Sequence, residues 1–374
     1  MGLPRKGAAI LAGVLVPGVL VLGLGAATFA LAGFKPATTY PVGAEPLDVV
    51  TGDFSGDGKL DLAISNRGGN NIVILRGNGN GRFGAAHTYK TSPRPLGLLV
   101  GDWNNDGRRD LAAASQSTLG GVTILLNNGS GFSKHTYPAG AGSSYVLAGK
   151  FTADQRPDLA VSNLDANTVS ILRGRAGGTF AKIGDLPTSP GPFGIAVSDF
   201  NHDGKQDVAV IDERKNHSTK VQVFPGNGDG TFDPPLDTFV GQGANEMAVG
   251  MFNGDSIPDL AVADFSLDQV EILIGNGNGG FRPPKPFPAG KNPAEIALGD
   301  FNNDGKTDLA LTDDDTPGRV SVLPRKPGLD FGGPLKYPVD GFPYGIAAAH
   351  LNGDNKLDIA TANFSGSASV LLGN

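Results

Sequence analysis

Short apolar segments alternate with polar turns along the chain after residue 33, and one order of segments recurs. An apolar run such as 96–100 leads into an acidic loop, and a second apolar run follows at 110–115. A third run, 122–126, contains alternating branched residues, and a glycine turn leads to a fourth. Runs of this length are typical of β-strands, and no segment has the 3.6-residue period of an amphipathic helix. The pattern therefore predicts an all-β protein built from units of four short strands.

This unit occurs seven times. Its acidic segment begins at residues 52, 101, 149, 198, 250, 299 and 349, and typical copies read GDFSGDGKLDLAIS and GDFNNDGKTDLALT. Successive copies are 48 to 52 residues apart. Asn-Gly pairs in the glycine turns supply the positive φ angles that tight hairpins need. Because four-stranded antiparallel units repeated radially are propeller blades, we predict a seven-bladed β-propeller over residues 34–374.

The two ends of the chain are predicted to complete one blade together. The last unit stops at 371–374, before the glycine turn and outer strand that the other units have. The segment 34–40 (FKPATTY) resembles 83–89 (FGAAHTY) and offers that missing strand. Pairing of the N- and C-terminal segments would close the ring and remove exposed strand edges.

The first 33 residues differ from the rest. Arg5 and Lys6 precede an uncharged apolar stretch at 8–33, and Ala-Leu-Ala at 30–32 has the small-x-small form of a signal cleavage site. The stretch is also long enough to span a bilayer. Two alternatives stay open, a cleaved signal peptide or a retained N-terminal membrane anchor. Both predict an extracytoplasmic protein that is secreted, periplasmic or membrane-anchored.

Composition narrows the chemistry. The 57 Gly and 27 Pro are typical of a chain with many turns. The net charge is −7 and Lys and Arg do not cluster, which argues against a nucleic-acid partner. The absence of Cys excludes disulfides, thiolate metal sites and cysteine nucleophiles. The acidic excess is best explained by carboxylates that hold cations.

Four of the seven acidic loops have a complete set of oxygen ligands. Position 1 is Asp, position 3 Asn or Ser, position 5 Asp, position 6 Gly and position 9 Asp, and position 7 offers a backbone carbonyl. Alternating oxygen ligands around a glycine turn suit Ca²⁺. An EF-hand is excluded because position 12 lies in an apolar strand and is not Glu. We therefore predict four calcium sites, with the ligands Asp53, Ser55, Asp57, Lys59 and Asp61; Asp102, Asn104, Asp106, Arg108 and Asp110; Asp199, Asn201, Asp203, Lys205 and Asp207; and Asp300, Asn302, Asp304, Lys306 and Asp308.

The other three loops are degenerate. Their residues at positions 1 and 6 are Lys150 and Gln155, Met251 and Ser256, and His350 and Asn355. The two positions change together, as expected if these loops have lost the ion. Asp at positions 5 and 9 remains in all seven loops. This indicates an additional turn-forming role through hydrogen bonds from side chain to backbone.

The repeated acidic segment resembles the FG-GAP/VCBS repeat family, and the blades look like those of the integrin alpha-subunit propeller. The resemblance covers residues 34–374. It implies calcium in the hairpin between the first and second strands of a blade, which applies here to the four complete loops. The family includes adhesion receptors, lectin-like proteins and some polysaccharide-degrading enzymes, so function has to be argued from the site.

Candidate ligand-binding residues are expected on the face opposite the acidic loops. A recurring polar residue five places after each ninth-position Asp either lines a ligand site or begins the next turn, and the second reading is favoured. Trp103 is predicted to be core because Phe stands at the equivalent position of other units. Tyr145 and Tyr344 are the remaining aromatic candidates near that face.

The sequence favours a binding, adhesion or scaffold module whose partner is an extracellular protein or a glycan. Its five His are scattered, and no nucleophile elbow, P-loop or HExxH is present. We therefore predict no catalytic residues and no enzymatic activity. The alternative is a calcium-dependent polysaccharide-active lyase or hydrolase on the same fold.

Overall fold

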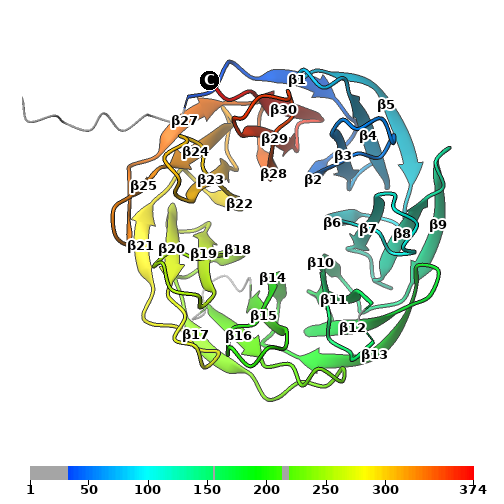
Figure 1. The fold of residues 1–374 in the computed structure, drawn as a ribbon, viewed down its shortest axis with the longest axis vertical. Helices are drawn as coiled ribbons and strands as arrows, with labels where there is room; N and C mark the ends of the chain where they lie inside the picture. The colour runs from blue at the N-terminus through cyan, green and yellow to red at the C-terminus, as the bar shows by residue number, and fades with distance from the viewer. Residues whose placement is uncertain (1–32, 155, 213–218) are drawn as a thin grey trace, which may run out of the picture.

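The computed structural model describes residues 33–154, 156–212 and 219–374. Seven sheets, each of four antiparallel strands, stand around a central axis (Figure 1), which confirms the predicted seven-bladed propeller. The elements in these ranges are all strands, so no helix there is long and apolar enough to cross a membrane. The predicted signal or anchor segment lies outside the described residues, apart from Gly33.

The strands of each blade follow one another from the axis outwards, except in blade 7. Blades 1 and 2 consist of β2 (Pro46–Gly52), β3 (Asp61–Asn66), β4 (Asn71–Gly77) and β5 (Phe83–Lys90), and of β6 (Pro95–Gly101), β7 (Asp110–Ser115), β8 (Val122–Asn127) and β9 (Phe132–Tyr137). Blades 3 and 4 consist of β10 (Ser143–Gly149), β11 (Asp158–Asn163), β12 (Thr168–Arg175) and β13 (Thr179–Pro187), and of β14 (Pro192–Ser198), β15 (Asp207–Asp212), β16 (Lys220–Phe224) and β17 (Leu236–Phe239). Blades 5 and 6 consist of β18 (Ala244–Gly250), β19 (Asp259–Asp264), β20 (Gln269–Leu273) and β21 (Lys285–Pro288), and of β22 (Pro293–Gly299), β23 (Asp308–Asp313), β24 (Arg319–Leu323) and β27 (Leu335–Pro338). Blade 7 consists of β28 (Pro343–Ala349), β29 (Asp358–Asn363), β30 (Ser367–Leu371) and β1 (Thr38–Pro41), and the short pair β25 (Arg325–Lys326) and β26 (Asp330–Phe331) extends from blade 6.

The second strand of every blade is buried along its whole length. Both of its faces are covered, because neighbouring blades pack against each side of a sheet. One apolar cluster, for example, joins Phe54 and Ile72 of blade 1 to Leu98 and Leu125 of blade 2. This two-sided burial explains why these strands read as continuous apolar runs.

An aromatic contact links each of blades 1 to 6 to the next blade. The aromatic residue that follows position 1 of the acidic loop packs on one at or near the start of the next blade's fourth strand, with ring centroids 5.5 to 6.4 Å apart. Blade 7 has Leu351 at this position. In blade 2 this residue is Trp103, which contacts Phe180 and is buried, as predicted. A Cβ on Gly101 would lie 2.3 Å from the Trp103 ring, so only glycine fits at that strand end.

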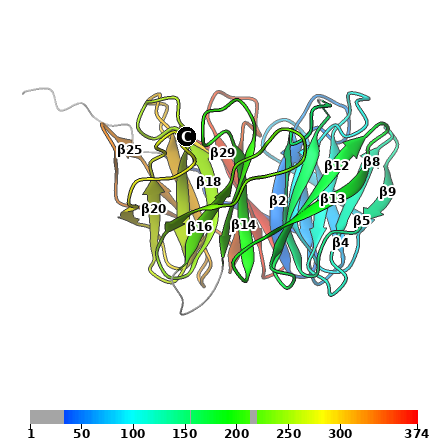
Figure 2. The same cartoon turned by 90° about the horizontal axis from the view of Figure 1, so that it is seen from below.

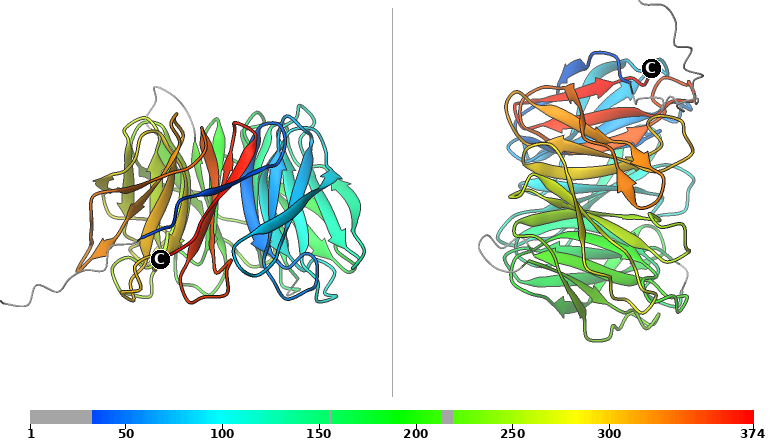
Figure 3. Two further views of the ribbon diagram at one scale, coloured as in Figure 1. Left: turned by 90° about the horizontal axis from the view of Figure 1, so that it is seen from above. Right: turned by 90° about the vertical axis from the view of Figure 1, so that its left-hand side faces the viewer.

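The two ends of the chain meet in blade 7. Strand β1 pairs antiparallel with β30, in the register Thr38↔Val370 (Figure 3). Phe34, just before β1, packs on Phe301 of blade 6, which is the aromatic contact that blades 2 to 6 make with the blade before them. An N-terminal segment therefore supplies the outer strand of the last blade.

The strands run between two faces, which Figure 2 shows edge on. The acidic-loop face is the one formed by the connections between first and second strands, such as β2–β3. The opposite face is formed by the connections between second and third strands and between successive blades. All the predicted calcium ligands belong to four connections of the acidic-loop face: β2–β3, β6–β7, β14–β15 and β22–β23.

Candidate functional site

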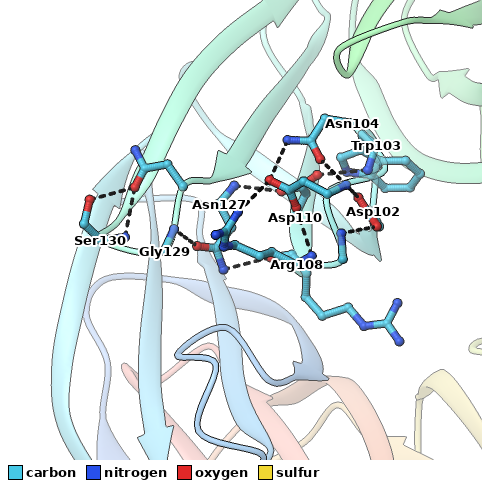
Figure 4. A network of polar contacts seen from close by, with 12 residues as sticks. Asp102, Trp103, Asn104, Arg108, Asp110, Asn127, Gly129 and Ser130 are labelled. Carbon is cyan, nitrogen blue, oxygen red and sulfur yellow. Dashed lines mark hydrogen bonds and ion pairs between the residues drawn. The ribbon is translucent and has the colours of Figure 1, made fainter.

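In the complete loops the first Asp closes the turn. Asp102 Oδ1 accepts a hydrogen bond from the Asp106 N–H at 3.0 Å, and its Oδ2 accepts one from the Gly107 N–H at 2.8 Å (Figure 4). The same pair of bonds forms in the loops that begin at Asp53, Asp199 and Asp300. Gly107 has a φ of 83°, in the left-handed region that favours glycine, which explains position 6.

The Asp at position 5 faces a basic side chain. Asp106 Oδ1 accepts the N–H of Arg108 at 2.9 Å, and its Oδ2 lies 3.0 Å from Arg108 Nη1. The backbone hydrogen bond from Arg108 is the main cause that lowers the pKa of Asp106. Lysine takes the place of Arg108 in the other complete loops, with Nζ to carboxylate distances of 2.9 to 3.6 Å. Position 7, predicted to offer its carbonyl, therefore also brings a cation to the loop.

The ninth-position Asp is fully buried in all seven loops and ties each loop to the third strand. In blade 2, Asp110 Oδ2 accepts the Trp103 N–H at 2.9 Å and Oδ1 accepts the Asn127 N–H at 2.7 Å. Asp259, in the degenerate loop of blade 5, makes the equivalent bonds at 2.6 and 2.9 Å. Burial raises the pKa of both carboxyls. These bonds confirm the predicted hydrogen-bonding role of this Asp, which complete and degenerate loops share.

The degenerate loop of blade 3 contains a cation that belongs to the protein. Asp154, at position 5, accepts hydrogen bonds from Nε and Nη2 of Arg173 at 3.0 and 2.8 Å. These bonds are the main cause that lowers the pKa of Asp154. The sequence analysis missed Arg173 because it lies on β12, outside the acidic segment. In the loops of blades 5 and 7, position 1 is an exposed Met251 and a His350 whose Nδ1 lies 2.9 Å from the Lys356 carbonyl.

The complete loops fit calcium in their donor chemistry. Their carboxylate, amide and carbonyl oxygens stand at alternate positions of one turn, and a carboxylate oxygen that accepts one N–H keeps a second lone pair. Within the described ranges, however, no three His, Cys, Asp or Glu side chains lie close enough together to hold a metal ion. The first, fifth and ninth carboxylates are directed at backbone N–H groups and at the basic side chain of position 7. Calcium binding therefore requires the position 5 carboxylate to exchange that basic group for the ion.

The recurring polar residue of the opposite face begins the next turn, the reading that the sequence favoured. Its seven members are buried: Asn66, Ser115, Asn163, Asp212, Asp264, Asp313 and Asn363. Asn163 Oδ1 accepts the Gly140 N–H at 3.0 Å, and Asp264 Oδ1 accepts the N–H groups of Ser266 and Leu267. These side chains hold the connections between strands and blades in place.

A pocket of about 380 Å³ lies on the opposite face at blade 7. It is lined by Leu47, Asp314, Phe342, Tyr344 and Phe364. Phe342 and Phe364 are 43% and 40% exposed, and the Phe364 N–H donates to the Phe342 carbonyl at 2.9 Å. Of the aromatic candidates named from the sequence, Tyr344 lines this pocket whereas Tyr145 is buried near the axis.

Sequence reasoning missed Phe342 and Phe364. Phe342 has a φ of 55°, in the left-handed region, and the equivalent residues of the other blades are Glu, Arg, Asn or Gly with positive φ. A bulky side chain in this conformation is an outlier that points to a function. Comparing the seven connections with each other would have shown that only blade 7 places Phe there.

The comparisons with known proteins agree with the repeat pattern. The family profile described as FG-GAP-like repeat matches residues 53–113, 102–161, 150–210, 252–311 and 300–361. No curated protein is a significant sequence match to the chain.

Two solved structures illustrate the fold similarity. BBS1N in complex with ARL6DN shares 16% identity, with 91% of this chain and 96% of that chain covered and a TM-score of 0.63. Virginiamycin B lyase from Staphylococcus aureus shares 13% identity, with 91% and 99% covered and a TM-score of 0.62. At such low sequence identity, the similarity shows only that these proteins share the propeller fold with this chain. Because one relative binds a protein and the other is an enzyme, the fold leaves both classes of function open.

Proposed function

This chain belongs to the FG-GAP-like repeat family, and from that premise we propose that it is an exported, calcium-binding propeller that binds a glycan. The observation that supports this proposal most directly is the blade 7 pocket. Two half-exposed phenylalanine rings and Tyr344 surround it, together with the carboxyl of Asp314. Aromatic rings pack against the C–H faces of sugar rings, and a carboxyl group hydrogen-bonds sugar hydroxyls. The volume of about 380 Å³ is within the range of small-ligand sites.

Asp314 is suited to this role by its surroundings. Burial is the main cause that raises its pKa, and the charge of Asp315 raises it further. A carboxyl held partly out of water gains more from a hydroxyl partner than an exposed one does. It would fix the orientation of a sugar whose apolar face lies on the rings.

Calcium would act on the other face of the ring. In each complete loop the carboxylates of positions 1, 5 and 9, the side-chain oxygen of position 3 and the carbonyl of position 7 would hold the ion, which supplies positive charge to an acidic turn. Its contribution would be structural, because the ninth Asp already joins the loop to the third strand. The ion would stabilise the acidic-loop face without contacting a sugar bound in the blade 7 pocket.

Export is proposed from the apolar N-terminal stretch. N-terminal sequencing of the protein recovered from the culture medium, the periplasm or the membrane fraction tests it. A start close to residue 33 would support a cleaved signal, and an intact N-terminus in the membrane fraction would support an anchor. An intact, soluble cytoplasmic protein would contradict export.

A glycan array tests the pocket. We expect the wild-type protein to bind a defined set of glycans, and the variant F342A/F364A to bind them at least about tenfold more weakly. The matched control is F239A, because Phe239 is 65% exposed on β17 and does not line the pocket. Equal binding by the double variant and the control, or no glycan bound by the wild type, would contradict the proposal.

A protein partner is the second candidate. Leu119 and Leu267 are 88% and 52% exposed on second-to-third-strand connections of the same face. An exposed leucine gains free energy when a partner protein covers it and removes its apolar surface from water. If glycans fail to bind while a protein partner is captured and lost again in L119S/L267S, the function is protein binding. Cleavage of a bound polysaccharide, followed by the appearance of reducing ends or unsaturated products, would instead show the enzymatic alternative.

A further inference from the structure

The axis of the propeller contains a second and larger cavity. Its volume is about 610 Å³, and it runs along residues 48–51 of β2, 98–100 of β6 and 145–148 of β10. The cavity begins at the third or fourth residue of these seven-residue strands and continues towards the acidic-loop face, whereas Leu47 and Tyr344 of the blade 7 pocket are second residues of their strands. Most of its wall is aliphatic, with side chains such as Val50, Leu99 and Met247.

Acidic groups gather at one level of this cavity. The first strand of each blade is its inner strand and has seven residues. The third residue of the inner strands is, in blade order, Asp48, Gly97, Tyr145, Gly194, Glu246, Glu295 and Gly345. We call these residues the axial ring. Its glycines make room for its large members: a Cβ on Gly194 would lie 3.0 Å from Glu246 Oε2, and one on Gly97 would lie 2.9 Å from the Tyr145 ring. A bulge in the pairing of the first and second strands accompanies this level in every blade.

The three carboxyl groups of the axial ring differ in the hydrogen bonds that they accept. Asp48 Oδ2 reaches the next blade and accepts the Leu98 N–H at 2.6 Å, and Glu295 Oε2 likewise accepts the Ile346 N–H at 2.9 Å. Glu246 Oε1 accepts the N–H of Met247 at 3.1 Å. Within the part of the chain that the structure describes, Glu246 Oε2 has no hydrogen-bond partner, although the residue is only 7% exposed and the Tyr145 side chain lowers the pKa of its carboxyl group. A buried, unpaired carboxylate oxygen on a cavity wall is costly unless a ligand completes it.

The carboxyl groups of the axial ring face no basic side chain among the described residues that line the cavity. Burial raises the pKa of Asp48 to about 6 and that of Glu246 to about 8. Burial, followed by the charges of Asp48 and Glu246, raises the pKa of Glu295 well above its ordinary value. The side chains that line the cavity, among the residues the structure describes, include no Lys, Arg or His. A cation from outside would pair with these carboxylates and favour their ionised forms.

We propose that the axial cavity binds an organic cation, an ammonium or guanidinium group on an apolar body, with the charged group at Glu246 Oε2. The aliphatic wall distinguishes this ligand from a bare metal ion, because a hydrated metal gains nothing from apolar contact whereas an alkyl chain is buried favourably there. A free amine and the Lys or Arg side chain of a partner protein share this chemistry. The other titratable groups that face Glu246 are Tyr145, Asp48 and Glu295. Asp48 and Glu295 would attract a bound cation when they are ionised, and the Tyr145 hydroxyl oxygen would accept a hydrogen bond from it.

Calorimetric titration of the whole protein with hexylammonium tests the proposal, with hexanol and Ca²⁺ as comparison ligands. We expect saturable binding of hexylammonium that is at least about tenfold tighter than that of hexanol. E246Q should weaken it at least about tenfold. The matched control is E271Q: Glu271 is a buried carboxyl on β20 that accepts the Gly241 N–H and does not line the cavity. E295Q provides a second test if E246Q does not fold.

Two further measurements identify the source of the bound cation and the protonation state of the carboxyl groups that bind it. A lysine-containing peptide that competes with hexylammonium would indicate a protein side chain, whereas lack of competition would indicate a free amine. Because the cation needs ionised carboxylates, binding should weaken as the pH falls from about 9 to about 6, through the pKa of Glu246. The variant F342A/F364A should bind hexylammonium normally, so failure of the sugar pocket and failure of the axial site are separable. No hexylammonium binding at pH 9, or equal binding by wild type and E246Q, would overturn the proposal.

Discussion

The acidic loops of blades 2 and 3 share a hairpin but differ at position 1 and in the number of arginines that pair with position 5. Asp110 and Asp158 make the same bonds to the loop start and to the third strand. In blade 2 the first position is Asp102, which closes the turn, and the fifth faces Arg108 of its own loop. In blade 3 the first position is Lys150, and the fifth pairs both with Arg156 of its own loop at 3.6 Å and with Arg173 of β12 at 2.8 Å. The ninth Asp therefore serves the hairpin, whereas positions 1 and 6 distinguish loops with a complete calcium ligand set.

The largest effect should come from the residue that the two loop types share. D110A and D259A should each lower the free energy of unfolding by roughly 2–4 kcal/mol, because each leaves two buried backbone N–H groups without an acceptor. Urea unfolding in calcium-free buffer measures this. A loss confined to D110A would show that the ninth Asp does not stabilise the two loop types alike, and would contradict its shared role in the hairpin.

The difference between the loops can also be reversed by mutation. M251D/S256G gives the loop of blade 5 the Asp and Gly of the complete set, around the existing Asn253, Asp255 and Asp259. We expect one additional equivalent of bound calcium and a rise in the melting temperature with calcium. S256G alone is the control. Unchanged stoichiometry in the double variant would show that positions 1 and 6 are not what separates the two loop types.

The axial ring provides a third class of carboxylate, which contacts neither loop type. Because burial raises the pKa of Glu246 from 4.5 to about 8, its contribution to stability is complete below pH 4.5 and is lost as the pH rises through 8. In the absence of an organic cation, the melting temperature of wild type should therefore fall relative to that of E246Q between about pH 4.5 and pH 8, and the difference should stay constant above pH 8. Parallel curves between pH 5 and pH 9 would contradict this environment for Glu246.

The sequence predicted those parts of the structure that repeat. The strand at 110–115, the buried Trp103 and the hydrogen-bonding role of the ninth Asp all follow from comparing one unit with the next, because the same local interactions recur in every blade. The calcium ligation that the resemblance implies stays a prediction.

The parts that the sequence did not predict are individual to one blade or lie between blades. Arg173 reaches Asp154 from another strand, and Phe342 is exposed through a backbone conformation that its residue type disfavours. Glu246 and Glu295 stand in buried strands, where their meeting with Asp48 depends on ring geometry. Aligning the inner strands position by position would have revealed three acidic residues, one tyrosine and three glycines at this level, but not the distances between them.

The smallest effect should come from Arg173 of blade 3, which pairs with Asp154. R173Q removes an ion pair whose arginine is half exposed, so we expect a loss below about 1 kcal/mol that shrinks further at high salt. R76Q, at the equivalent position of blade 1, is the control. A larger loss for R173Q than for D259A would mean that the degenerate loops depend on an internal cation more than on their ninth Asp.

Calcium titration of the chelator-treated protein, by calorimetry with parallel melting curves, tests the central claim most directly. We expect four equivalents of bound calcium, a clear rise in melting temperature, and three equivalents in D102A, whose loop loses its first ligand. Absence of binding and of any thermal shift would contradict it. The acidic loops would then be turns stabilised by their own hydrogen bonds and by the basic residue at position 7.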